Sequence, residues 1–307
     1  MKKIIFMLLT QILLVSNVNA ATIVYPKSDN VTINSECTFF IGNENPERTL
    51  TINGQEVKLH KTGAFKHAVD LEYGENIFEF DNGIEKQTYI VKRGKATAPI
   101  HDTESFEELT KNQDSNFASN IKQKSKSEKI IITIDPGHGG NEFGAIGCLC
   151  EKEKDVNLQI ANKLKKYLEE DGFIVFMTRE DDKYVGLRER VNFANSKKTD
   201  IFLSIHCNAL PDSRAKTQIS GSEVYYLYPQ SKELAQNILK SLGKETGLET
   251  RGVYQRNFAV VRNPNSLAVL VEVGYIIDPT EEEKLINHCF QQKAAKAIMQ
   301  GVKNYLK

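Results

Sequence analysis

The sequence predicts an α/β domain with an open, twisted, mostly parallel sheet and helices on both faces, preceded by a small all-β sandwich. Three observations support this prediction. Apolar strands alternate with amphipathic helical stretches from residue 129 to residue 307. Residues 21–93 instead contain short alternating segments separated by turn signals. Residues 94–128 are polar and have no sustained period, so we expect them to be a linker.

The first 20 residues have the three parts of a secretory signal. Two lysines follow Met1, an apolar run covers residues 4–15, and Ala20 is a small residue suited to cleavage. The apolar run is too short to span a bilayer, and an uncleaved anchor is the alternative. No cysteine lies at the cleavage point. We therefore expect an exported protein, periplasmic or extracellular, with no stable membrane anchor after cleavage.

Charge and cysteine content set further limits. The chain carries 40 basic and 40 acidic residues, and signal cleavage removes two lysines and no acid. This balance gives no electrostatic reason to expect nucleic-acid binding. An odd number of cysteines in an exported chain leaves at least one unpaired; they are Cys37, Cys148, Cys150, Cys207 and Cys289.

The β-rich part begins after the signal. Asn53-Gly54 separates two short alternating runs, which is a strong hairpin signal. About seven short strands are expected in residues 21–93, a pattern that resembles the immunoglobulin-like modules of bacterial envelope proteins. No catalytic group of residues is visible there. We expect this part to contact the wall or an envelope protein.

The α/β part is predicted element by element from its periodicity. Gly172 and Gly247 end two of its helices, and an apolar strand precedes Glu272. A capping box at residues 280–283 is expected to open the last helix. The expected order is strand 130–134, helix 153–170, strand 173–177, helix 187–196, strand 201–205, strand 223–228, helix 231–246, strand 267–271 and a final helix.

Two histidines stand at the ends of predicted strands. The run Asp-Pro-Gly-His-Gly-Gly at 135–140 stops an apolar strand and places His138 at its tip. His206 follows the apolar run 201–205 in the same way. Open α/β sheets bind ligands at the carboxyl ends of their strands, so the two imidazoles are candidate site residues.

Helical phase selects a carboxylate for the same place. Glu153 precedes Ile160 by seven residues and Leu164 by eleven, which at about 100° per residue puts it within about 20° of the buried face. Glu151 points the opposite way. An inward carboxylate is costly unless a cation meets it. Two imidazoles and one carboxylate with a fourth position open to water are the ligands of a hydrolytic zinc site.

Glu272 ends an apolar strand and can serve as the proton acceptor of such a site. Simpler interpretations remain for each acid. Glu153 is also suited to the first turn of a helix, where the dipole favours acids, and Glu272 can pair with Arg251 or Arg262. A thiolate at Cys148 or Cys150 is an alternative metal ligand, although soft ligands would close the site.

Residues 129–307 resemble the catalytic domain of zinc-dependent N-acetylmuramoyl-L-alanine amidases, which cleave bacterial peptidoglycan. The ordered motifs that carry the resemblance are 135–140, 144–147, 153–158, 178–179, 187–190, 194–195, 204–208, 251–253 and 269–275. The resemblance implies zinc bound by His138, Glu153 and His206, with Glu272 as the catalytic glutamate. The implied reaction is hydrolysis of the amide between N-acetylmuramic acid and the L-alanine of the stem peptide.

The chain departs from the family pattern at several positions. Glu142 replaces a common Asp, Cys207 replaces a common small residue, and the connection 148–152 is about one residue longer, which leaves the choice between Glu151 and Glu153 open. Two other function classes also remain. A zinc peptidase acting within the stem peptide would keep the same ligands, and a non-catalytic peptidoglycan-binding or regulatory protein would be expected to lose one.

Some members of the family carry an inhibitory helix after the second zinc-binding histidine. Here only a short polar segment, residues 209–220, separates Asn208 from Gly221, and it has no apolar helical face. We therefore expect residues 129–307 to act without an activator and the β-rich part to serve mainly for placement on the wall.

Overall fold

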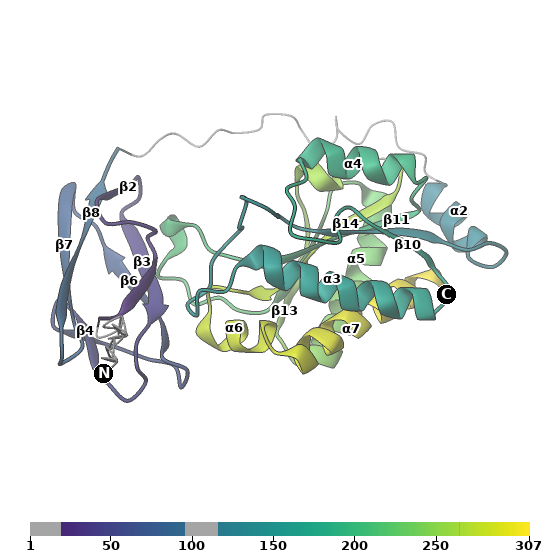
Figure 1. The fold of residues 1–307 in the computed structure, drawn as a ribbon. Helices are drawn as coiled ribbons and strands as arrows, with labels where there is room; N and C mark the ends of the chain where they lie inside the picture. Colours follow the sequence, from purple (N-terminus) through teal and green to yellow (C-terminus); the bar gives the residue numbers. More distant parts are fainter. Residues whose placement is uncertain (1–19, 96–115, 264) are drawn as a thin grey trace, which may run out of the picture.

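The computed structural model describes residues 20–95, 116–263 and 265–307 (Figure 1). The predicted signal peptide, apart from Ala20, and the greater part of the predicted linker lie outside the described residues. Within the described ranges, no helix combines the length and the apolar character that crossing a membrane requires.

The α/β domain is built on a six-stranded, mostly parallel sheet, as predicted. Strands β9 to β11 and β14 run in one direction, and β12 pairs antiparallel with β14 and parallel with β13. The order across the sheet is β10-β9-β11-β14-β12-β13. The strands are β9 (Ile131–Pro136), β10 (Ile174–Met177), β11 (Ile201–Asn208), β12 (Ser222–Tyr226), β13 (Thr250–Gln255) and β14 (Leu267–Tyr275).

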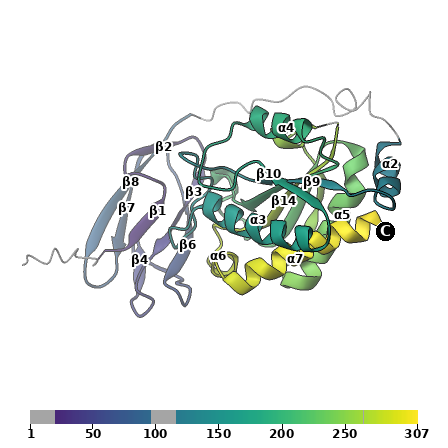
Figure 2. The same ribbon diagram turned by 45° about the vertical axis from the view of Figure 1, so that its right-hand side comes forward.

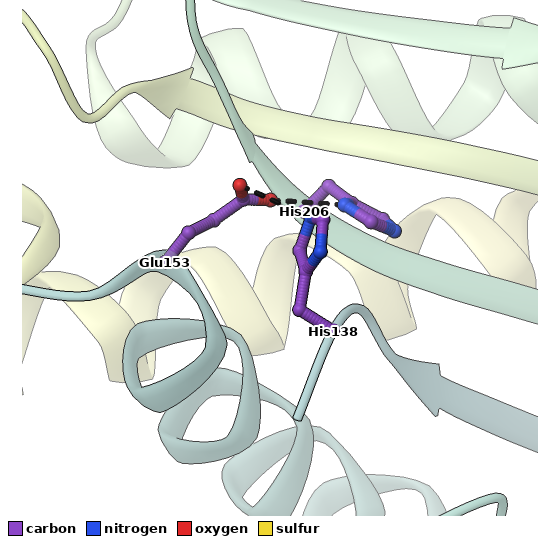
Figure 3. Close-up of side chains that lie close together, drawn as sticks. All are labelled: His138, Glu153 and His206. Carbon is purple, nitrogen blue, oxygen red and sulfur yellow. Dashed lines mark hydrogen bonds and ion pairs between the residues drawn. The ribbon is translucent and has the colours of Figure 1, made fainter. Parts of the chain in front are cut away.

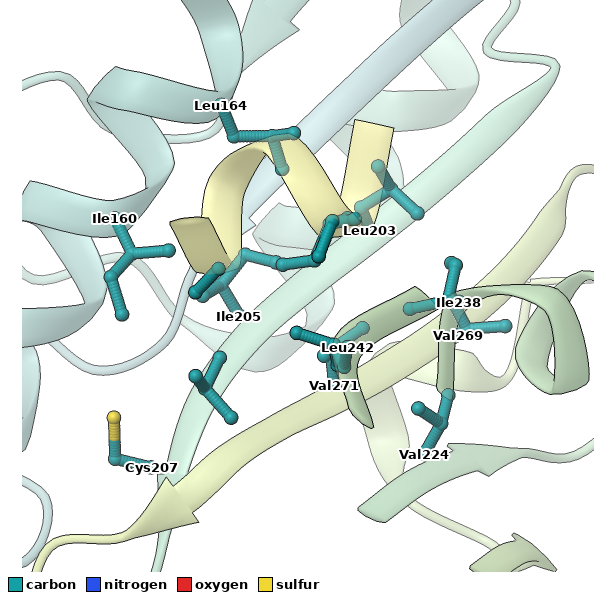
Figure 4. Packing of buried hydrophobic residues seen from close by; sticks show 14 of the residues in the cluster. Ile160, Leu164, Leu203, Ile205, Cys207, Val224, Ile238, Leu242, Val269 and Val271 are labelled. Atoms are coloured by element: carbon teal, nitrogen blue, oxygen red, sulfur yellow. The ribbon is translucent and has the colours of Figure 1, made fainter. Parts of the chain in front are cut away.

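Helices cover both faces of this sheet (Figures 1 and 2). One face packs on α3 (Glu153–Glu170), α5 (Lys232–Thr246) and α7 (His288–Leu306). Aliphatic side chains of α3, α5 and the central strands interdigitate there, among them Ile160, Leu164, Leu203, Ile238 and Val271 (Figure 4). The other face is covered by α4 (Leu187–Ser196) and the short η3 (Ala259–Val261). Short helices η1 (Asp212–Arg214), η2 (Pro229–Ser231) and α6 (Pro279–Leu285) complete the domain.

Four details differ from the sequence-based expectations. Strand β13 was not predicted. The single helix expected after the last strand is two helices, α6 and α7. The helix after β14 is capped by Asp278, whose side chain accepts hydrogen bonds from the backbone N–H groups of Thr280 and Glu281, so the predicted capping box at 280–283 is wrong. The expected linker contains helix α2 (Phe117–Lys124), which buries Ile121 in the core of the α/β domain.

The N-terminal part forms two β-sheets around a core of its own. The three-stranded sheet has the order β1-β3-β6 and the five-stranded sheet the order β2-β8-β7-β4-β5. Phe40, Phe65 and Phe80 lie in the core between them. The strands are β1 (Thr22–Tyr25), β2 (Val31–Ile33), β3 (Cys37–Asn43), β4 (Leu50–Ile52), β5 (Gln55–Val57), β6 (Ala64–Asp70), β7 (Gly74–Asp81) and β8 (Lys86–Arg93).

The three-stranded sheet is covered on both faces. Along β3 the side chains alternate, so that Phe40 points into the sandwich while Phe39 and Ile41 belong to the core of the α/β domain. Both views place β3 and β6 beside the α/β domain (Figures 1 and 2). The β-domain is thus packed against the α/β domain. Placement on the wall alone would not require this contact.

Candidate metal centre

Three of the sequence-predicted site residues meet at the carboxyl edge of the sheet (Figure 3). His138 Nε2 lies 3.2 Å from Glu153 Oε2, and His206 Nδ1 lies 2.9 Å from Glu153 Oε1. One ligand atom from each residue lies within 4.8 Å of the other two, which is close enough for a single metal ion. The imidazole rings are 5.0 Å apart and nearly perpendicular.

The turn after β9 holds His138 in a left-handed backbone conformation, with φ of 60°. Its Nδ1 lies 3.2 Å from Glu142 Oε1, which leaves Nε2 to face Glu153. A carboxylate is one of the usual partners of the outer ring nitrogen of a metal-binding histidine. Gly137 leaves room for the second histidine, because an added Cβ would stand 2.2 Å from His206 Cε1.

A buried network behind this turn keeps its shape. Asp135 is fully buried and accepts hydrogen bonds from Arg190 (2.7 Å), Thr178 (2.6 Å) and Ser204 (2.8 Å). The same guanidinium of Arg190 donates to the His138 carbonyl at 2.8 Å. Helix α4 therefore positions a histidine that it does not itself carry. The sequence-based reasoning missed these supporting residues, because none of them is a metal ligand.

Glu153 is the first residue of α3 and is only 5 % exposed. Its carboxylate accepts hydrogen bonds from the backbone N–H groups of Ala145 (2.9 Å) and Cys207 (3.2 Å). The side chain of Asn157, one turn along, donates to Oε1 at 3.3 Å. The carboxylate is thus fixed from the loop, the neighbouring strand and its own helix.

The charges of this group suit a cation. Burial by itself raises the pKa of Glu153, but hydrogen bonds from His138 and His206 and their charges outweigh burial and hold that pKa well below its usual range. For His138, burial lowers the pKa, yet Glu153 and Glu142 together leave it raised above 6.5. A buried, ionised carboxylate between two imidazoles is a donor set that fits a zinc ion.

Glu272 lies beside the three residues. It is paired with His206 in the register of β11 and β14, so both side chains leave the same face of the sheet. Its Oε2 is buried and has no hydrogen-bond partner among the residues that the structure describes. Burial, and then the charges of Glu153 and Glu223, raise the pKa of Glu272 well above 4.5.

Arg251, an alternative partner of Glu272 on the sequence alone, instead binds Glu223, with Nε 2.9 Å from Oε1. The hydroxyl group of Tyr275 donates to the same oxygen at 3.0 Å, and Tyr225 donates to Oε2. Arg262 donates to Asn257. Neither alternative pairing of Glu272 is therefore formed, and the Glu223 cluster is a second group that sequence reasoning missed.

The remaining candidates lie outside the group. The residues that form the candidate metal site do not include Glu151, Cys148 or Cys150. Cys148 is buried and directs its Sγ toward the Ile277 carbonyl at 3.5 Å, and burial raises the pKa of its thiol. All five cysteines are free.

Comparison with known families agrees with this geometry. A family model described as N-acetylmuramoyl-L-alanine amidase matches residues 132–304, which is more than half of the chain. A probable cell wall amidase of Staphylococcus epidermidis is 39 % identical over 176 residues, covering 57 % of this chain and 57 % of that relative. The matched part therefore spans less than two thirds of the relative's length.

Solved structures show the same relationship. An N-acetylmuramoyl-L-alanine amidase from Clostridium difficile 630 is 38 % identical with a TM-score of 0.56, covering 59 % of this chain and 98 % of that structure. The CwlD amidase from Clostridioides difficile, solved in complex with the GerS lipoprotein, is 30 % identical with a TM-score of 0.54, covering 58 % of this chain and 98 % of that one.

Proposed function

Because the chain belongs to the N-acetylmuramoyl-L-alanine amidase family, we propose that it hydrolyses the amide bond between N-acetylmuramic acid and the L-alanine of the stem peptide in peptidoglycan. The observation that carries this proposal is the group of His138, Glu153 and His206, with the unpartnered Glu272 beside it. A protein that only bound the wall would not need a buried carboxylate without a partner.

We assign zinc to this centre, held by His138, Glu153 and His206. When bound, zinc supplies a Lewis acid and an activated water to such a site. Glu142 orients His138 through Nδ1, and Asn157 with two backbone N–H groups orients Glu153. These contacts fix the direction of the ligand atoms before a metal arrives, which lowers the cost of binding it.

Glu272 is assigned as the general base. Its Oε2 lies on the same face of the sheet as His206 and has no competing hydrogen bond, so it can accept the proton of the attacking water. The same oxygen then donates that proton to the amide nitrogen, which leaves as the free amine of L-alanine. The carboxylate of Glu223 is held by Arg251 and by the hydroxyl groups of Tyr225 and Tyr275, so Glu272 is the carboxylate available for this transfer.

The site of action is proposed to be outside the cell. The Staphylococcus epidermidis relative is named a cell wall amidase, which supports a secreted or wall-associated role for this chain. The CwlD complex with a lipoprotein supports the proposal that this protein also contacts an envelope protein, for which the β-domain is our candidate.

The experiment that tests the reaction is mass spectrometry of purified sacculi after incubation with the zinc-loaded protein, with and without a chelator. We expect free stem peptides that begin with L-alanine and glycan chains without peptide, and no product with the chelator. Shortened stems still attached to muramic acid would identify a peptidase acting within the stem instead. Intact sacculi in both samples would point to a binding protein.

A further inference from the structure

We propose that the β-domain forms one wall of the substrate site, in a pocket between the two domains that takes the stem peptide beyond its first alanine. This inference rests on the proposed function. The interdomain pocket has a volume of about 260 Å³. The β-domain contributes Val24, Tyr25, Phe39 and Ile41 to its lining, and the exposed Lys27 also lines it.

The interdomain pocket adjoins the metal centre through two segments of the α/β domain. Gly144 and Ala145 line it, and the Ala145 N–H group donates to Glu153. A Cβ on Gly144 would stand 2.5 Å from Glu153 Oε2, which shows how close this wall is to a ligand atom. The other segment, residues 209–212, begins three residues after His206. A substrate positioned at the metal centre therefore has the interdomain pocket as a neighbour.

The β-domain wall is held in place by polar contacts to one residue of that second segment. Asp212 accepts hydrogen bonds from the Tyr25 hydroxyl at 2.7 Å and the Thr38 hydroxyl at 2.6 Å. The rings of Tyr25 and Phe39 stack with centroids 5.0 Å apart. Because Phe39 belongs to the core of the α/β domain, this wall is built into the enzyme.

The lining identifies the occupant. Apart from Lys27, Asp212 and the Tyr25 hydroxyl, the walls consist of aliphatic and aromatic groups and glycine. A sugar ring would leave its hydroxyl groups without partners against such walls, which costs free energy. A short peptide with small side chains buries apolar surface there, and Lys27 can meet its carboxylate. The volume lies below the range of about 300–1,000 Å³ typical of drug-sized ligands, so it suits one or two small residues.

A second pocket, which shares residues 209–211 with the interdomain pocket, has the opposite character. Its volume is about 360 Å³, and its lining includes Arg214, Arg251, Arg256 and three tyrosines. Those donors and acceptors suit a ligand rich in hydroxyl groups. This contrast favours the peptide, rather than the glycan, as the occupant of the interdomain pocket.

The test uses the zinc-loaded mature chain with two substitutions in the interdomain pocket. Val24→Phe fills part of the space, and Lys27→Glu reverses the charge at an exposed position. The matched controls are Ile77→Phe, 60 % exposed on β7, and Lys126→Glu, an exposed position just after α2. Strand β7 and helix α2 lie at the two ends of the molecule, away from the contact between the domains (Figure 2). Zinc content and Tm are measured for every variant.

Each protein is assayed on a muropeptide with a complete stem and on N-acetylmuramoyl-L-alanine, which lacks the rest of the stem. We expect both pocket variants to raise KM for the complete stem at least tenfold and to change kcat/KM for the short substrate less than threefold, with both controls unchanged. Equal effects on the two substrates, or none on either, would overturn the proposal. If Val24→Phe loses zinc or stability, Lys27→Glu alone decides.

A binding titration separates this proposal from the proposed function. The free stem peptide is titrated into the native chain and the pocket variants by calorimetry. Native protein that binds the peptide more tightly than the variants, yet cleaves no substrate, would overturn the amidase assignment and keep the pocket. Native protein that releases L-alanine-terminated stems, with variants that bind and cleave like it, would overturn the pocket alone.

Discussion

At the residue scale, the centre depends on one carboxylate with many partners. Glu153 lies between two imidazoles and accepts hydrogen bonds from two backbone N–H groups and from the side-chain amide of Asn157. The observed partners therefore favour a role of Glu153 in metal binding over a favourable interaction with the helix dipole alone.

The choice between the two neighbouring glutamates can be tested directly. We expect Glu153→Ala to lose zinc, because the two histidines alone leave the site without its anionic ligand. Glu151→Ala should keep stoichiometric zinc, since Glu151 is not part of the group. Metal analysis of the purified variants measures both. Zinc loss from the Glu151 variant, with retention in the Glu153 variant, would reverse the assignment.

The proposed role of Glu272 as a base, rather than as a metal ligand, can be tested by substitution. Glu272→Gln should retain zinc and lose about 10²–10⁴-fold in kcat, the usual contribution of a general base. His138→Ala and His206→Ala should lose both zinc and turnover. Parallel measurements of zinc content and of the release of stem peptides that begin with L-alanine distinguish these outcomes. A Glu272 variant that arrived without metal would show that Glu272 is a ligand.

At the element scale, helix α6 supports the loop that leads into α3. The carboxylate of Glu282 is fully buried and accepts the Leu149 N–H with both oxygens at 3.0 Å. Burial raises the pKa of Glu282 to about 7. The long connection 148–152 is therefore held by a helix that comes much later in the chain.

This carboxyl predicts a pH dependence of stability. Its folded-state pKa lies above the usual 4.5, so the folded state binds more protons between these values. Stability should then fall as the pH rises from about 4.5 to about 7, by up to about 3 kcal/mol at about 1.4 kcal/mol per pKa unit. Thermal unfolding at pH 5 and pH 8 should show a smaller decrease for Glu282→Gln than for the native chain. The exposed Glu47→Gln is the control, and equal decreases in all three would contradict the assignment.

At the scale of the whole molecule, the β-domain is part of the folded unit that contains the site. Phe39, Ile41 and Ala64 pack into the core of the α/β domain, and Asp212 joins the two by hydrogen bonds. This contact bears on the expectation that residues 129–307 act alone. A fragment without the β-domain exposes the apolar surface that these residues cover.

We expect residues 116–307, which keep α2, to bind zinc, because the three proposed ligands lie within them. We expect them to unfold at a lower temperature than residues 21–307, the predicted mature chain. In the full chain, Asp212→Ala should cost about 1–3 kcal/mol through two lost hydrogen bonds. In a domain of this size, each kcal/mol lost from the free energy of unfolding lowers Tm by about 2–4 °C. Calorimetric unfolding measures both, with Asp181→Ala as an exposed control. A fragment as stable as the mature chain would show that the domains are independent.

The sequence by itself determined the elements whose periodicity is local. Helix α3 spans Glu153–Glu170 as predicted, because its apolar spacing and its terminal glycine are read from neighbouring residues. The same local signals placed His138 and His206 at strand ends. Parallel strands bring their carboxyl ends to one edge, so it was also predictable that these residues meet Glu153.

Only the tertiary structure decided the contacts between distant segments. Strand β13 is half-buried at the edge of its sheet, so its pattern is too weak to predict a strand. The apolar run Phe39-Phe40-Ile41 indicates a strand buried on both faces, but nothing local tells that the second face packs against the α/β domain. The same holds for two polar pairs, Arg251 with Glu223 and Tyr25 with Asp212. Each pair forms because the folded backbone brings the two side chains within reach, and sequence spacing does not contain that information.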